Sequence, residues 1–137
     1  MKPVQLEDLK VGIRAKLAGL WIVLMLLYIY ADIFSLYRPG HIDEMIAGFM
    51  GPLPVSQMTL GFSAILMAVP ALMVLACLFM GAKGLRGLSI AVGTLYVFIG
   101  VGNLIGETWV YYLIYGMVQI LLTLLIVLLA LKWPKKA

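Results

Sequence analysis

The sequence predicts an all-α fold, a bundle of four transmembrane helices with a short amphipathic helix in the first extracytoplasmic loop. Of the 137 residues, 64% are hydrophobic and only 12% are charged, whereas about a quarter of the residues in a soluble domain are charged. Polar residues are therefore too few to cover a soluble fold, and lipid is expected to cover it instead. The apolar residues also gather into four runs, each long enough to cross about 30 Å of hydrocarbon.

The four runs are the expected spans of a single membrane domain that takes in residues 1–137. They cover approximately residues 15–36, 55–80, 85–105 and 110–131. The last three runs are joined by only a few residues each, at 81–84 and at 106–109. Links this short place consecutive helices side by side and antiparallel.

Three prolines mark where helices are expected to end, begin or bend. Pro39 is followed by Gly40, a turn signal that ends the first span. Pro54 is expected to begin the second span, because a proline in the first helical turn loses no hydrogen bond there. Pro70 falls in the middle of that span, where it must free the carbonyl of Leu66. A kink is therefore expected in the second span.

The loop between the first two spans is expected to carry the short amphipathic helix. Its apolar residues recur at helical spacing, and two acidic residues stand in the first turn, where the helix dipole favours them. The apolar residues are Ile42, Met45, Ile46, Phe49 and Met50, and the acidic residues are Asp43 and Glu44. Such a helix is expected to lie in the membrane interface, and Gly51 and Pro52 are expected to end it.

The basic residues predict the orientation of the bundle. Nine of the ten fall on one side of the expected membrane, namely Lys2, Lys10, Arg14, Lys16, Lys83, Arg86, Lys132, Lys135 and Lys136. Arg38 is the basic residue on the other side. Because cytoplasmic loops carry an excess of Lys and Arg, we expect the N- and C-termini to be cytoplasmic. So strong a bias argues against small multidrug transporters that insert in both orientations. The basic residues flank apolar runs, so membrane lipid is the expected partner and nucleic acid is not.

Cofactor and metal chemistry have no motif in this sequence. The single cysteine, Cys77, excludes an intramolecular disulfide. His41 with Asp43 and Glu44 lacks the spacing that defines metal motifs, so we expect no metal site. There is also no phosphate-binding loop, nucleophile elbow or zinc-protease motif, and we expect no cofactor.

Polar side chains recur on one face of three of the expected spans. They are Tyr28 and Asp32 in the first span, Tyr96, Asn103 and Glu107 in the third, and Tyr112, Tyr115, Gln119 and Thr123 in the fourth. Residues three, four or seven apart share a helix face. Each of these helices therefore carries one polar stripe, and the stripes are densest in the outer half of the membrane.

The convergence of the stripes predicts a polar pocket between the helices, open or nearly open to the outer face. We expect its ligand-binding residues to be Tyr28, Asp32, Asn103, Tyr115 and Gln119. A carboxylate at the depth of Asp32 must be protonated, hydrated or paired, and Arg38 and His41 are the nearest basic residues in sequence. The alternative is that these polar side chains only hydrogen-bond neighbouring helices, each contributing about 0.6 kcal/mol. Two small-residue pairs, Ala15 with Gly19 and Gly102 with Gly106, fit close helix approach.

Several short motifs carry a resemblance over nearly the whole chain. They are residues 16–21 and 28–32, Pro39 with Gly40, Gly51, Gln57, Met67 with Pro70, and residues 131–134. In these the chain resembles an uncharacterised bacterial family of small four-helix membrane proteins, a domain of unknown function that is similar in architecture to the DoxX-like group. The resemblance implies a bacterial cytoplasmic (inner) membrane and no particular activity. A glutamate is usual in that family where this chain has Ala68 and Gln119, so a proton-carrying role is not expected there.

Three functions stay open at this point. The first is a membrane protein whose outer pocket binds a small amphipathic molecule or a lipid. The second is a structural or assembly subunit of a membrane complex. The third is a membrane-embedded enzyme that acts on a lipophilic substrate with Asp32 as acid or base, which would need a second titratable group in the same pocket. A version that translocates its ligand would need a homodimer, because four helices leave little room for a pathway.

Overall fold

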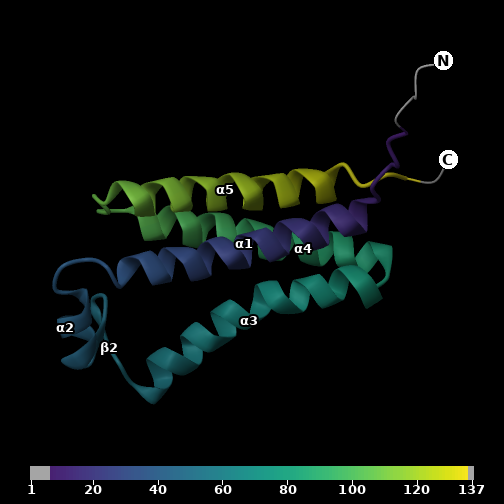
Figure 1. The fold of residues 1–137 in the computed structure, drawn as a ribbon. Coiled ribbons are helices and arrows are strands. Elements are labelled where there is room, and N and C mark those ends of the chain that lie inside the picture. The colour runs from purple at the N-terminus through teal and green to yellow at the C-terminus, as the bar shows by residue number, and fades with distance from the viewer. Residues whose placement is uncertain (1–6, 136–137) are drawn as a thin grey trace, which may run out of the picture.

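The computed structural model describes residues 7–135 and confirms the all-α fold (Figure 1). Its helices are α1 (Ile13–Ser35), α2 (His41–Ile46), α3 (Gln57–Phe79), α4 (Ala82–Leu104) and α5 (Val110–Leu131), and its strands are β1 (Phe49–Met50) and β2 (Leu53–Pro54). The long helices α1, α3, α4 and α5 are each long and apolar enough to cross a membrane, as expected of a multi-pass membrane protein. Their ends differ from the predicted spans by three residues or fewer.

The four long helices form a bundle in which α1 lies between α3 and α5, while α4 packs along α5 (Figure 1). The start of α1, the link between α3 and α4, and the end of α5 lie together at one end of the bundle. We call this the basic end, because its described basic residues are Lys10, Arg14, Lys16, Lys83, Arg86, Lys132 and Lys135; Lys2 and Lys136 lie outside the described residues. The opposite end, which carries α2 and the two strands, is called the loop end.

Two arginines at the basic end cap the last turns of neighbouring helices. Arg14, near the start of α1, donates from Nη1 to the carbonyl of Cys77 at 3.2 Å and to that of Met80 at 2.7 Å, at the end of α3. Arg86, in α4, donates from Nε to the carbonyl of Ala130 at 3.1 Å, at the end of α5. A cation at a helix C-terminus offsets the negative end of the helix dipole and satisfies carbonyls that lack an intrahelical partner.

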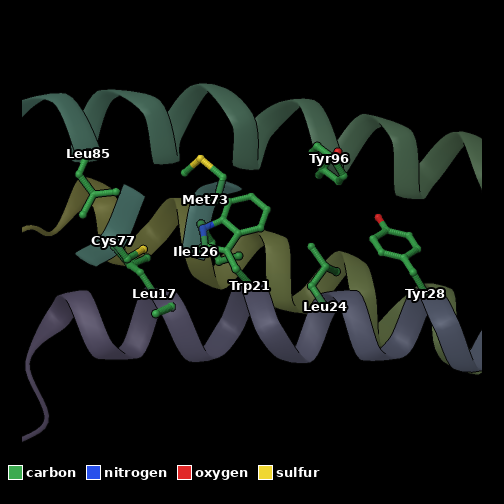
Figure 2. Close-up of a cluster of buried hydrophobic side chains, with 10 residues drawn as sticks. Leu17, Trp21, Leu24, Tyr28, Met73, Cys77, Leu85, Tyr96 and Ile126 are labelled. Atoms are coloured by element: carbon green, nitrogen blue, oxygen red, sulfur yellow. The ribbon is translucent and has the colours of Figure 1, made fainter. Parts of the chain in front are cut away.

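An aromatic cluster fills the middle of the bundle (Figure 2). Trp21 and Tyr28 of α1 both meet the ring of Tyr96 of α4 edge to face, with centroid distances of 6.0 and 6.4 Å. Met73 and Cys77 bring α3 into the same cluster. Aromatic pairs in this geometry add about 0.5–1.5 kcal/mol to the effect of burial, so Tyr96 is a central contact of the core.

The predicted kink in α3 is visible, and its freed carbonyl has a partner. Figure 1 shows α3 bending near its middle, where Pro70 interrupts the ladder of hydrogen bonds. The hydroxyl of Tyr96 donates to the carbonyl of Leu66, the group that Pro70 was expected to free. The bend carries the first half of α3 away from α1 at the loop end (Figure 1).

The start of α3 differs from the prediction. Pro54 was expected to begin this helix, but it lies in β2, and α3 begins at Gln57. Ser56 is the N-cap: its Oγ accepts from the Thr59 N–H at 3.1 Å, and the Thr59 hydroxyl accepts from the Ser56 N–H at 2.8 Å. This capping box satisfies two otherwise unpaired groups, and it determines the helix start more strongly than the preceding proline does.

The strand pair was not predicted. Phe49 and Met50 were expected in the short helix, with Gly51 and Pro52 ending it, but the helix ends at Ile46. Instead β1 and β2 pair antiparallel, with Phe49 opposite Pro54 and Met50 opposite Leu53. The turn between them depends on Gly51, which has a φ of 58°, a conformation open to glycine at little cost. The loop after α1 therefore consists of the short helix α2 followed by a β-hairpin.

Close contact between α4 and α5 depends on glycines other than the predicted ones. A Cβ at Gly93 would lie 2.8 Å from Val127, one at Gly100 would lie 2.9 Å from Ile120, and one at Gly116 would lie 2.3 Å from Leu104. At Gly19 and Gly102, by contrast, a Cβ would meet no described atom within 4 Å. The two predicted small-residue pairs therefore do not mediate close packing between the described helices of one chain.

Candidate functional site

A cavity of about 730 Å³ lies at the loop end of the bundle. Residues from α1, the loop after it with α2 and the hairpin, the start of α3, the link between α4 and α5, and the start of α5 form its walls. The polar wall consists of Asp32, Ser35, Arg38, His41, Glu107 and Tyr112, and the apolar wall consists of Leu36, Met45, Phe49, Met50, Pro52, Val55 and Leu60, with Gly51 between them. The cavity is amphipathic and lies in the space that opens where α3 bends away from α1.

An ion pair between Arg38 and Glu107 joins two segments that are far apart in the sequence. Arg38 Nη2 lies 2.7 Å from Glu107 Oε1, and both side chains are mostly buried. The same carboxylate oxygen accepts from the backbone N–H groups of Thr108 and Trp109, each at 2.9 Å. Because Trp109 is the N-cap of α5, the negative charge also meets the positive end of that helix dipole.

Three aromatic rings surround the guanidinium group of Arg38. Its Cζ lies 5.1 Å from the ring centroid of Trp109, 5.2 Å from that of Tyr111 and 5.5 Å from that of Tyr112. A cation within about 6 Å of an aromatic centroid is attracted by the negative face of the ring. We call Arg38, Glu107, Trp109, Tyr111 and Tyr112 the arginine cluster.

The arginine cluster shifts the titration of both charged groups. Burial alone would raise the pKa of Glu107, but the contacts with Arg38 and with the two N–H groups outweigh it and hold the pKa below its usual range. Burial alone would lower the pKa of Arg38, and its contacts with Glu107 and Tyr111 outweigh this and raise it. Both groups are therefore charged at neutral pH.

Ser35 connects the end of α1 to the arginine cluster. Its hydroxyl bonds to the carbonyl of Ala31 at 2.9 Å and to the hydroxyl of Tyr111 at 2.9 Å. Tyr111 also stacks on Phe34 of α1, at a centroid distance of 6.0 Å. The end of α1 and the start of α5 are thus joined by polar and aromatic contacts on one side of the cavity.

Asp32 reaches the same cavity from the last turns of α1. Within residues 7–135, no cation lies within 4 Å of its carboxylate and no group donates a hydrogen bond to it. His41, which also lines the cavity, lies 3.9 Å from Glu44, measured from Nδ1 to Oε2. An ion pair of Asp32 with Arg38 or His41, one of the alternatives that the sequence leaves open, is therefore absent in the described part of the chain, and Arg38 pairs with Glu107 instead.

The other predicted ligand-binding residues lie away from the cavity wall. Tyr28 is in the aromatic cluster of the core, and Gln119 is buried on α5. Tyr115 is half-buried beside Phe34, at a centroid distance of 5.8 Å, and Asn103 is exposed near the end of α4. The structure thus does not bring these four side chains together around Asp32. A ligand-binding role for each of them stays a prediction.

The arginine cluster was missed because its members had been interpreted one by one. By sequence, Arg38 is near Asp32, whereas Glu107 and Tyr112 belong to the polar stripes of two different spans, so no local pattern links Arg38 to Glu107. A usable signal is present in the sequence: one basic residue on the side of the membrane with few basic residues, and one acidic residue two positions before a segment in which three of four residues are aromatic. Within residues 7–135, no three His, Cys, Asp or Glu side chains gather in a group that could hold a metal ion.

Comparison with known proteins gives a family and no activity. No curated protein and no solved structure matches the chain. The model of one family, described as a family of unknown function (DUF6326), matches residues 7–137. The resemblance to an uncharacterised family of small membrane proteins is confirmed to that extent. Because the match covers almost the whole chain, this protein belongs to the DUF6326 family.

Proposed function

We propose that this multi-pass membrane protein binds a small amphipathic molecule or a lipid in the cavity at the loop end. The amphipathic wall of the cavity is the observation that supports this most strongly. Its volume of about 730 Å³ falls within the 300–1,000 Å³ range of typical small-molecule sites. Asp32, His41 and Tyr112 would orient the polar part of the ligand, while Leu36, Val55, Leu60 and their neighbours would hold the hydrocarbon part.

The proposal includes an orientation. The basic end would lie in the cytoplasm, as the positive-inside rule requires, so both termini would be cytoplasmic and the cavity would lie at the outer face. The membrane would be the bacterial cytoplasmic membrane, and the bundle would share the architecture of the DoxX-like group. The exposed apolar residues of α2, Ile42, Met45 and Ile46, would then sit in the outer interface beside the cavity.

A cavity-filling substitution tests the proposal. Leu60 lines the cavity from the start of α3, so Leu60→Trp is expected to fill part of it. Ile65→Trp is the matched control, because Ile65 is on the same half of α3, is 67% exposed and does not line the cavity. The wild type and the control are expected to retain a bound small molecule in native mass spectrometry after mild extraction, and Leu60→Trp is expected to lose it. Equal occupancy of the two variants, or no bound molecule in the wild type, would contradict the proposal.

A membrane-embedded enzyme is the second candidate, because Asp32 and His41 line the same cavity and acid–base chemistry on a bound substrate needs two such groups. In this case the molecule recovered from Asp32→Asn would be the substrate and would differ from the molecule recovered from the wild type in mass or, for an isomerisation, in chromatographic retention at the same mass. The same molecule in both would exclude this candidate and leave a binding protein.

A further inference from the structure

We infer that the cavity at the loop end takes an organic cation, with the positive group of the ligand beside the carboxylate of Asp32. The inference rests on the proposed function and specifies its ligand class. The ligand would be an amphipathic molecule that carries an ammonium group or a similar cation.

The charges of the cavity wall favour a cation. Arg38 and Glu107 neutralise each other at 2.7 Å, and Glu107 Oε1 also accepts two backbone hydrogen bonds. The hydroxyl of Ser35 is engaged with Ala31 and Tyr111. Among the described residues that line the cavity, Asp32 is therefore the carboxylate without a partner. Apart from His41, which lines the same wall without forming an ion pair with Asp32, a ligand cation would be the partner of this carboxylate.

The end of α1 strengthens this preference. Asp32 lies in the last turn of α1, which contains no basic residue, and the C-terminus of a helix carries about half a negative charge. The contrast with the basic end is direct, because there Arg14 caps α3 and Arg86 caps α5. Within residues 7–135, no side-chain cation donates to the last carbonyls of α1. The carbonyls of Ile33, Phe34 and Ser35 accept from the backbone N–H groups of the turn that follows, each at 3.1 Å, so the carboxylate of Asp32 is the main negative feature on this side of the cavity.

The rest of the wall fits the remainder of such a ligand. Leu36, Val55 and Leu60 offer an apolar surface for the hydrocarbon part, while the ring of Tyr112 on the polar side already contacts the guanidinium group of Arg38. An ammonium group could come from a phospholipid headgroup such as phosphatidylethanolamine or from a free amphipathic amine. The two sources share the same chemistry at Asp32.

The test compares three probes of similar shape and different charge. Tetraphenylphosphonium is the cation, triphenylphosphine oxide is neutral and tetraphenylborate is the anion. Each is equilibrated by dialysis with the full chain in dodecyl maltoside, an uncharged detergent without an amine, and binding to empty micelles is subtracted. The wild type is expected to bind the cation saturably and at least about tenfold more tightly than the other two probes.

Variants assign that preference to a residue. Asp32→Asn keeps the shape of the side chain and is expected to remove the preference for the cation. Asp43→Asn is the matched control, because Asp43 is an exposed carboxylate of α2 that does not line the cavity, and it is expected to bind as the wild type does. If Leu60→Trp weakens the binding of all three probes and Asp32→Asn changes none of them, the cation inference is overturned and the proposed function stands. Binding that Leu60→Trp does not change would overturn both.

Added lipid then identifies the source of the cation. If a lipid headgroup occupies the site, phosphatidylethanolamine is expected to compete with tetraphenylphosphonium. Phosphatidylglycerol with the same acyl chains is then expected not to compete. If neither lipid competes, the ligand is a free amphipathic amine. Either result is compatible with a cation at Asp32; competition by phosphatidylglycerol alone would contradict it.

Discussion

Arg38 Nη2 and Glu107 Oε1 lie 2.7 Å apart, and this contact fastens the loop after α1 to the link between α4 and α5. The helix in that loop, α2, contributes no buried residue. The loop is therefore held over the cavity mainly by its two ends and by the arginine cluster. Its position relative to the bundle depends on a charge pair more than on apolar packing.

Glu107→Gln is expected to lower the free energy of unfolding by about 1–3 kcal/mol, because it replaces a charged acceptor of three hydrogen-bonding groups with a neutral one. Thermal unfolding in detergent measures the change. Glu44→Gln is the control, since its side chain is 62% exposed and lies 3.9 Å from His41; its effect is expected to stay below about 1 kcal/mol. Equal effects of the two substitutions would show that the arginine cluster does not hold the loop.

The same pair predicts a pH dependence with a definite sign. The pKa of Glu107 is lower in the folded chain than in an unfolded one, so the pair stabilises the fold fully above the usual glutamate pKa. This stabilisation is lost as the pH falls through the lowered pKa of the folded state. The difference in melting temperature between the wild type and Glu107→Gln is therefore expected to shrink as the buffer is acidified from pH 7. A difference that grows on acidification would contradict the assigned shift.

Tyr96→Phe is expected to destabilise the fold by about 1–3 kcal/mol, because the carbonyl of Leu66 that Pro70 leaves free would lose its donor. Tyr28→Phe is a close control: Tyr28 lies in the same cluster, and among the described residues no group hydrogen-bonds to its hydroxyl. Its removal is expected to change stability by less than about 0.5 kcal/mol. Unfolding curves of the two variants check the difference, and a reversed order would exclude this role for Tyr96.

Gly116→Ala is expected to loosen the contact between α4 and α5. The new Cβ would lie 2.3 Å from a methyl carbon of Leu104 and 2.9 Å from its Cγ, so the whole side chain must move, at a cost of about 1–3 kcal/mol. Gly102→Ala introduces the same methyl group on α4 where nothing described lies within 4 Å, and it is expected to be neutral or slightly stabilising. A Gly116→Ala variant as stable as the wild type would mean that α4 and α5 pack less closely than described.

The sequence predicts the helices well because each is a long apolar run, and segments with glycine or proline separate one run from the next. The free carbonyl of Leu66 could also be predicted, because a proline in a helix always removes the hydrogen bond to the carbonyl four residues before it. The hairpin could not be predicted, because two strands of two residues each carry no periodic signal.

The candidate site was predictable only in part. Asp32 stood out because a carboxylate near the end of an apolar run is rare. The stripes on the third and fourth spans predicted which residues share a helix face, and Gln119 and Thr123 are indeed buried together. Spacing does not give the rotation of one helix relative to another, however, and Asn103 is exposed whereas Tyr96, seven residues earlier, is buried. The pairing of Arg38 with Glu107 depends on how α1 and α5 meet in space, which no local pattern contains.

The central claim is that the cavity beside Asp32 holds a ligand. An experimental structure of the full chain in a lipid nanodisc, at a resolution that shows side chains, tests it most directly. We expect non-protein density between Asp32, Tyr112 and Leu60, with its polar end at the carboxylate. A cavity closed by repacking of α3 against α1, with the side chains of Leu36 and Leu60 in contact and no space between them, would contradict it.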